Sequence, residues 1–152
     1  MPISRVIMNA SPIICLIKAG ITDILPSLFK DIVVPEEVKR EILVKGANNL
    51  KEKVFASYQW IRLVDDIVIA PQVASWDLGQ GESAVISFVL ENPDFWAVID
   101  DREARRCAMA LQPPYRDSGN NSLGQEKRGH PFDSGIYREA ERGRFVAVRR
   151  AC

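Results

Sequence analysis

Short apolar runs alternate with longer segments of helical periodicity along the first 111 residues. The apolar runs are Arg5–Met8, residues 32–34 and residues 95–99, and a segment with apolar residues at helical spacing follows each of them. Apolar runs of this length, bounded by polar or turn-forming residues, are typical of buried strands. Strands that alternate with helices predict an α/β fold, a three-layer sandwich with a mostly parallel central sheet.

Local signals predict where several of these elements begin and end. Ser11 is a suitable N-cap for the first helix, with Pro12 at its first position, and Gly20 is a suitable end. Residues 60–64 and 67–70 are further strand candidates. In parallel sheets the ligand crevice lies beyond the carboxyl ends of the strands, so Asn9 and Asp100 are expected near it.

Composition narrows the class of protein. The chain has 152 residues, 47% of them apolar, which suits one domain with one core. No apolar run approaches the roughly 18–20 residues of a membrane span, and the N-terminus does not have the pattern of a signal peptide. Three scattered cysteines and one histidine favour a cytoplasmic protein without a histidine- or cysteine-rich metal site.

The last 41 residues differ in character from the rest. Residues 1–111 carry a net charge of −3, whereas residues 112–152 carry +3, five of the nine glycines, one leucine and one isoleucine. This composition predicts no packed apolar helix over residues 117–152. We therefore divide the chain into a domain over 1–111 and a divergent glycine- and arginine-rich tail over 112–152.

Three acids are placed where they could carry chemistry. Asp100 and Asp101 follow a buried strand, and Glu82 lies near the start of an apolar helix. Carboxylates gathered at strand ends suit Mg²⁺ or Mn²⁺, which can activate water and neutralise a phosphodiester. From spacing alone a plainer explanation is favoured, because acids that cap helices or occupy their first turn are far commoner than metal-binding acids.

Four motifs in order resemble the PIN-domain nucleases, the fold of VapC-type toxins. They are the segments 8–14 (Met-Asn-Ala-Ser-Pro-Ile-Ile), 34–42 (Val-Pro-Glu-Glu-Val-Lys-Arg-Glu-Ile), 81–86 (Gly-Glu-Ser-Ala-Val-Ile) and 99–108 (Ile-Asp-Asp-Arg-Glu-Ala-Arg-Arg-Cys-Ala). The resemblance covers residues 3–111. It implies a metal-dependent endoribonuclease that acts on RNA, plausible as the toxin of a toxin–antitoxin pair, with an antitoxin protein and a homodimer as expected partners.

The resemblance also assigns roles to residues. Asn9, Glu82 and Asp100 would hold Mg²⁺ or Mn²⁺, with Asp101 either a helper or the true ligand. Ser11 would be a supporting hydroxyl or a helix cap. Three arginines are candidates for contact with RNA phosphates, although a solvated helix face would explain them too; they are Arg102, Arg105 and Arg106.

Two departures from the family pattern predict weak activity or none. The family has an aspartate where this chain has Asn9, so the site has one negative charge fewer. The tail does not match the family's Gly-Thr-Leu-Gly segment and apolar helix in the present reading frame. Shifted by one nucleotide, however, the codons of residues 117–131 can encode Thr-Leu-Gly-Ile-Ile-Leu-Leu-Ala-Lys-Lys-Arg-Gly-Val-Ile-Pro, an amphipathic helix of the family type. The alternatives are a non-catalytic module that binds RNA or protein, and the product of a decayed gene.

Overall fold

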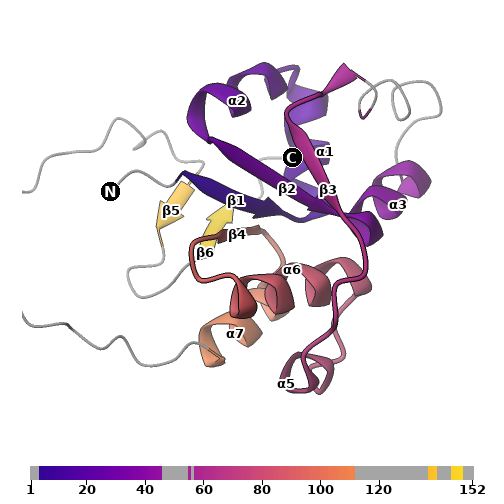
Figure 1. The fold of residues 1–152 in the computed structure, drawn as a ribbon, viewed down its shortest axis with the longest axis vertical. Coiled ribbons are helices and arrows are strands. Elements are labelled where there is room, and N and C mark those ends of the chain that lie inside the picture. Colours follow the sequence, from indigo (N-terminus) through magenta and orange to yellow (C-terminus); the bar gives the residue numbers. More distant parts are fainter. Residues whose placement is uncertain (1–3, 46–54, 56, 112–136, 140–144, 149–152) are drawn as a thin grey trace, which may run out of the picture.

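The fold is an α/β sandwich built on a six-stranded sheet (Figure 1). The computed structural model describes residues 4–45, 55, 57–111, 137–139 and 145–148. The strands are β1 (Arg5–Met8), β2 (Asp31–Pro35), β3 (Ile61–Val64), β4 (Trp96–Ile99), β5 (Tyr137–Glu139) and β6 (Phe145–Val148). Their order is β3-β2-β1-β4-β6-β5; all neighbours are parallel except β5 and β6. The predicted three-layer fold with a mostly parallel sheet is confirmed.

Strand β1 lies inside the sheet, between β2 and β4. Ile7 pairs with Val33 on one side and with Ala97 on the other. The consecutive residues Val6, Ile7 and Met8 are all buried, with at most 1% of their surface exposed. Neighbouring side chains on a strand point to opposite faces, so both faces of the sheet at β1 are covered, as is usual for parallel sheets.

Helices cover both faces. The helical elements are α1 (Ala10–Ala19), the 3₁₀ turn η1 (Thr22–Ile24), α2 (Leu25–Leu28), α3 (Glu36–Lys45), α5 (Pro71–Ala74), α6 (Gln80–Glu91) and α7 (Arg102–Ala110). In Figure 1, α1 and α2 lie on the opposite side of β1 and β2 from α6 and α7. Ile13 of α1 and Leu25 of α2 meet Met8 and Ile32 around a cavity of about 10 Å³, which is too small to serve as a ligand site.

Several helix ends follow from the sequence. Gly20 ends α1 in the left-handed conformation, at φ 68°, and its N–H bonds back to Ile17 and Leu16. That backbone geometry favours glycine. Asn92 ends α6, and Asp101 caps α7.

Two local expectations were wrong. α1 begins at Ala10 with Asn9 as its N-cap residue, so Ser11 lies inside the first turn and is exposed rather than capping. Residues 67–70 form no strand; they lead from β3 to α5. In the tail, for which only the absence of a packed apolar helix was predicted, β5 and β6 extend the sheet beyond β4.

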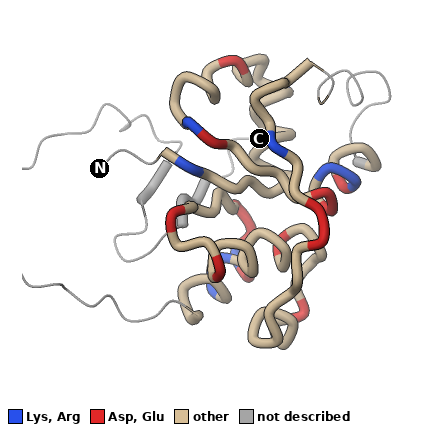
Figure 2. The backbone as a smooth tube through the Cα atoms, viewed as in Figure 1, with Lys and Arg blue, Asp and Glu red and all other residues tan. Residues whose placement is uncertain are grey.

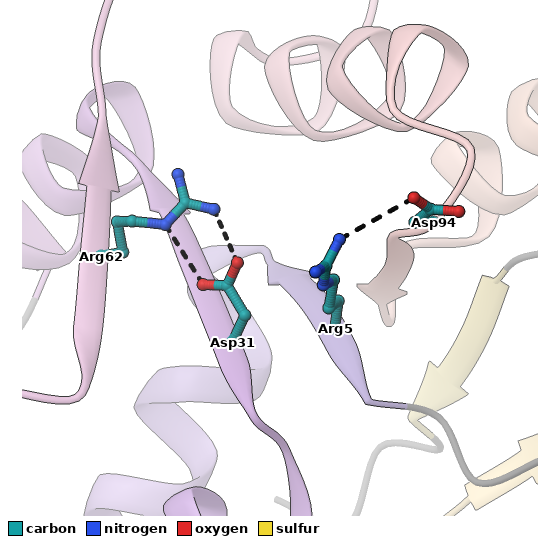
Figure 3. Close-up of polar contacts among 4 residues, drawn as sticks. All are labelled: Arg5, Asp31, Arg62 and Asp94. Carbon is teal, nitrogen blue, oxygen red and sulfur yellow. Dashed lines mark hydrogen bonds and ion pairs between the residues drawn. The ribbon is translucent and has the colours of Figure 1, made fainter.

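Two ion pairs lie at the amino edge of the sheet (Figure 3), and the arginines of both also approach one aromatic ring. Arg62 of β3 donates from Nε and one Nη to the two carboxylate oxygens of Asp31 at 3.2 and 2.8 Å. Asp31 raises the pKa of Arg62, chiefly through these hydrogen bonds. Arg5 lies 3.8 Å from Asp94, and both arginines lie 5.9 Å from the centre of the Phe95 ring. These contacts lie at the starts of the strands, whereas Asn9 and Asp100 follow the ends of β1 and β4.

Among the described residues, no single helix has both the length and the apolar character needed to cross a membrane. The segments Ala10–Ala19 and Thr22–Leu28 meet these two criteria only when taken together, and the chain bends sharply between them.

Candidate functional site

The carboxyl ends of β1 and β4 bring two of the predicted site residues to one edge of the sheet. Met8 pairs with Val98, so Asn9 directly follows one strand while Asp100 directly follows the other. The Asn9 backbone N–H donates to the Val98 carbonyl oxygen at 3.2 Å, which fixes the main chain at this point. Asp100 is half-buried. The strand geometry thus places both residues at the crevice edge expected of parallel sheets.

Asn9 and Glu82 are in direct contact. The Asn9 side chain is 1% exposed, and its Nδ2 donates a hydrogen bond to Glu82 Oε1 at 3.1 Å. Glu82 reaches it from the first turn of α6, whose N-cap residue is Gly79. An acid in the first turn also interacts favourably with the helix dipole. The other amide atom, Asn9 Oδ1, is buried and has no hydrogen-bond partner among the described residues.

Glycines at the start of α6 allow these groups to come together. A Cβ on Gly79 would collide with Glu82 Oε2. A Cβ on Gly81 would lie 3.0 Å from Glu41 Oε2 and 3.2 Å from Asn9 Oδ1. The Gly-Gln-Gly-Glu sequence therefore lets the backbone of α6 approach β1 and α3 closely enough to place a second acid, Glu41, beside Asn9.

Glu41 is a site residue that the sequence reasoning missed. It belongs to α3, and α3 packs against α6. The signal was present, because the segment 34–42 was one of the four motifs in the resemblance to PIN domains. Position within a helix gave no reason to choose Glu41 over Glu36 or Glu37, since the approach of α3 to Asn9 depends on tertiary packing.

The Asp101 side chain caps the start of α7. Its Oδ2 accepts a hydrogen bond from the Ala104 backbone N–H at 2.9 Å, which caps α7. Asp101 is exposed and also borders the groove that contains Glu82. The capping explanation thus describes one of its oxygens, and a role in chemistry would fall to the other.

The arginines of α7 have different surroundings. Arg106 is exposed and pairs with Glu103 at 3.1 Å, one helical turn away. Arg102 is exposed and Arg105 is half-buried. Surface pairs of this kind contribute little to stability, and Arg106 is partly neutralised as a phosphate ligand.

An acidic groove of about 710 Å³ lies beside Glu82. Acidic residues also mark α3 and α6 in Figure 2. The charged residues that border the groove are six acids and one base: Glu37, Glu41, Asp77, Glu82, Asp101, Glu103 and Arg40. A groove with this balance repels phosphate groups unless a cation or a basic group lies between them.

The arrangement fits a divalent cation poorly. Hard cations take oxygen ligands, preferably carboxylates. Here the Asn9 amide turns a nitrogen, with its positive N–H dipole, toward Glu82. Within the described part of the chain, no three His, Cys, Asp or Glu side chains form a cluster that could hold a metal. The Asn9 Nδ2–Glu82 Oε1 hydrogen bond occupies one oxygen of Glu82, while Asn9 Oδ1 has no hydrogen-bond partner among the described residues.

Comparison with known families agrees with the fold and the motifs. The family described as DUF3368, PIN domain, matches residues 5–116. The chain therefore belongs to this PIN-domain family. PIN domains are in general nuclease-like proteins that act on RNA and depend on a divalent metal. No curated protein matches the chain.

Proposed function

We propose that this chain is a PIN-like endoribonuclease that cleaves RNA weakly or not at all as written. Its ancestral activity is metal-dependent cleavage of RNA with Mg²⁺ or Mn²⁺, as the toxin of a toxin–antitoxin pair. One observation carries the loss of activity: the Asn9 amide donates to Glu82 where a carboxylate would attract a cation. At an effective dielectric of about 20, a unit charge about 4 Å from a cation is worth roughly 4 kcal/mol per charge, before desolvation offsets it.

The placement of the residues supports the following roles. Glu82 and Asp100 are the principal acids, Glu41 is a further acid beside Asn9, and Asp101 contributes its second oxygen while capping α7. Ser11 lies exposed in the first turn of α1, two residues after Asn9, and its hydroxyl is a supporting group in this proposal. Arg102 and Arg105 are the better candidates for RNA phosphate contact, because Arg106 pairs with Glu103.

The tail is the second part of the proposal. We propose that residues 112–152 include a frame-shifted stretch near Asp117 that replaces the apolar helix used by the family. The nucleotide sequence of the locus tests this directly. An insertion or deletion near codon 117, whose reversal restores the family segment, is the expected result. An open reading frame with synonymous codons that cannot encode that segment would refute it.

Activity is tested with four proteins: the unmodified chain, Asn9→Asp, the frame-corrected tail, and both changes together. Cleavage of single-stranded RNA is measured with Mg²⁺ and with Mn²⁺, and Asp100→Ala in each background is the blank. We expect Asn9→Asp to restore cleavage in part and the double correction to restore it fully. If the unmodified chain cleaves as fast as the doubly corrected one, and Asp100→Ala abolishes both activities, the site is intact and the proposal is wrong.

The acidic groove favours a second candidate function, a non-catalytic PIN-like binding module. Six acids around one arginine suit a basic protein surface better than an RNA backbone when no cation is bound. An antitoxin protein or a second copy of the chain would be the partner in such a role. Binding of RNA or protein by the unmodified chain, without cleavage by any of the four proteins, would favour this function.

A further inference from the structure

Asn9 is a neutral side chain buried in contact with one acid, Glu82, and close to a second, Glu41. Its Nδ2 lies 3.1 Å from Glu82 Oε1. Its Oδ1 lies close to Gly81 and has no hydrogen-bond partner among the described residues, and Glu41 Oε2 lies close to the same glycine. The Asn9 backbone N–H donates to the Val98 carbonyl oxygen, which fixes the main chain from which the amide side chain projects.

The Asn9 amide avoids the charge repulsion that a carboxylate at position 9 would create beside Glu82. An aspartate at position 9 would put a second negative charge within hydrogen-bonding distance of Glu82. Two carboxylates that share a buried site cannot both stay ionised unless a cation lies between them. The amide N–H of Asn9 can donate a hydrogen bond, and it faces Glu82, so the contact between Asn9 and Glu82 needs no cation.

We infer that Asn9 makes this corner of the fold independent of metal. The amide N–H supplies the positive group that joins the end of β1 to the first turn of α6, and Mg²⁺ or Mn²⁺ adds nothing to the stability of the chain. Aspartate at the same position would make folding depend on a divalent cation. Stability without metal is separate from RNA cleavage, so either property can fail while the other holds.

Thermal unfolding of three variants tests the inference. Asn9→Asp creates the carboxylate pair, and Asn9→Asp with Glu82→Gln exchanges the two groups, so that an amide again donates to a carboxylate. Asp77→Asn is the control, because it removes a charge from the same groove. Each protein is melted in EDTA and in increasing Mn²⁺.

In EDTA, Asn9→Asp should lower the Tm by roughly 4–8 °C, and the exchanged pair should recover most of that loss. Mn²⁺ should raise the Tm of Asn9→Asp, while the unmodified chain, the exchanged pair and Asp77→Asn should not respond. An unmodified chain that gains as much from Mn²⁺ as Asn9→Asp, or an Asn9→Asp variant as stable as the unmodified chain in EDTA, would overturn the inference. If Asn9→Asp does not fold in EDTA, the exchanged pair decides: folding supports the inference, and failure to fold refutes it.

Discussion

Gly81 has less space around it than any side chain would need. A Cβ there would lie 3.0 Å from Glu41 Oε2, 3.1 Å from Val38 Cγ2 and 3.2 Å from Asn9 Oδ1. Gly81→Ala should therefore lower the free energy of unfolding by roughly 1–3 kcal/mol, through overpacking at the candidate site. Urea unfolding, read from the shift in midpoint at constant m-value, measures this loss.

The control for that substitution is Gly20→Ala. Nothing lies within 4 Å of a Cβ at Gly20, but its φ of 68° is left-handed. Its expected cost of about 1 kcal/mol is conformational and should leave metal and RNA binding unchanged. A Gly81→Ala protein as stable as the unmodified chain would show that Glu41 and Val38 can move aside.

The buried thiol of Cys107 should make the free energy of unfolding depend on pH in the alkaline range. Its side chain is fully buried and its thiol is free, and burial raises the pKa of that thiol. Because the pKa of the thiol is higher in the folded state than in the unfolded state, the protonated thiol stabilises the fold fully below the unfolded pKa of about 8.5. This stabilisation is lost as the pH rises through and above that value.

Comparison with Cys107→Ala isolates this effect, because the other two cysteines are present in both proteins. The difference in unfolding free energy between the unmodified chain and Cys107→Ala should shrink between pH 7 and pH 10. A difference that stays constant or grows over that range would show that the thiolate is tolerated in the core.

At the scale of elements, the edge strand β3 is held to β2 by a bidentate ion pair. Arg62 contacts both oxygens of Asp31 (Figure 3). A lysine cannot make the same two bonds, so Arg62→Lys should destabilise the chain. Because the Arg62 side chain is 52% exposed, the loss should be only about 0.2–1 kcal/mol and should fall with added salt.

Arg5→Lys is the matched substitution for Arg62→Lys. Both arginines lie over the Phe95 ring, but Arg5 makes only one ion-pair contact, 3.8 Å to a largely exposed Asp94, so its replacement should change unfolding by less. Urea unfolding at low and high salt measures both. Equal losses at the two positions would show that the bidentate geometry adds nothing to the attachment of β3.

Elements with strong local signals could be predicted from the sequence. The run at residues 95–99 is apolar throughout and became β4, and Asp101 is a helix-capping residue directly before α7. The strand proposed at 67–70 failed because apolar residues alone do not make a strand without a partner edge. Val68 there is 74% exposed. Pairing of β6 with β4 depends on tertiary position, which the irregular composition of the tail did not reveal.

Some features of the candidate site could also be predicted from the sequence, and others could not. Asn9 and Asp100 could be placed at one edge because each directly follows a strand, and strand ends are local features. The Asn9–Glu82 hydrogen bond and the approach of Glu41 could not be predicted, since both depend on how closely α6 packs against α3 and β1. The spacing of residues along the sequence does not reveal side-chain distances that depend on close packing against a glycine.

At the scale of the whole molecule, the interior position of β1 has a consequence for synthesis on the ribosome. Ile7 pairs with both Val33 and Ala97, which are 64 residues apart (97 minus 33). At about 5–20 residues per second, Ala97 is made roughly 3–13 s after Val33. Throughout that delay the nascent chain carries an apolar strand with one edge unpaired, a template for pairing with other chains. Newly made copies are therefore most prone to aggregation, and most dependent on chaperones, before β4 emerges.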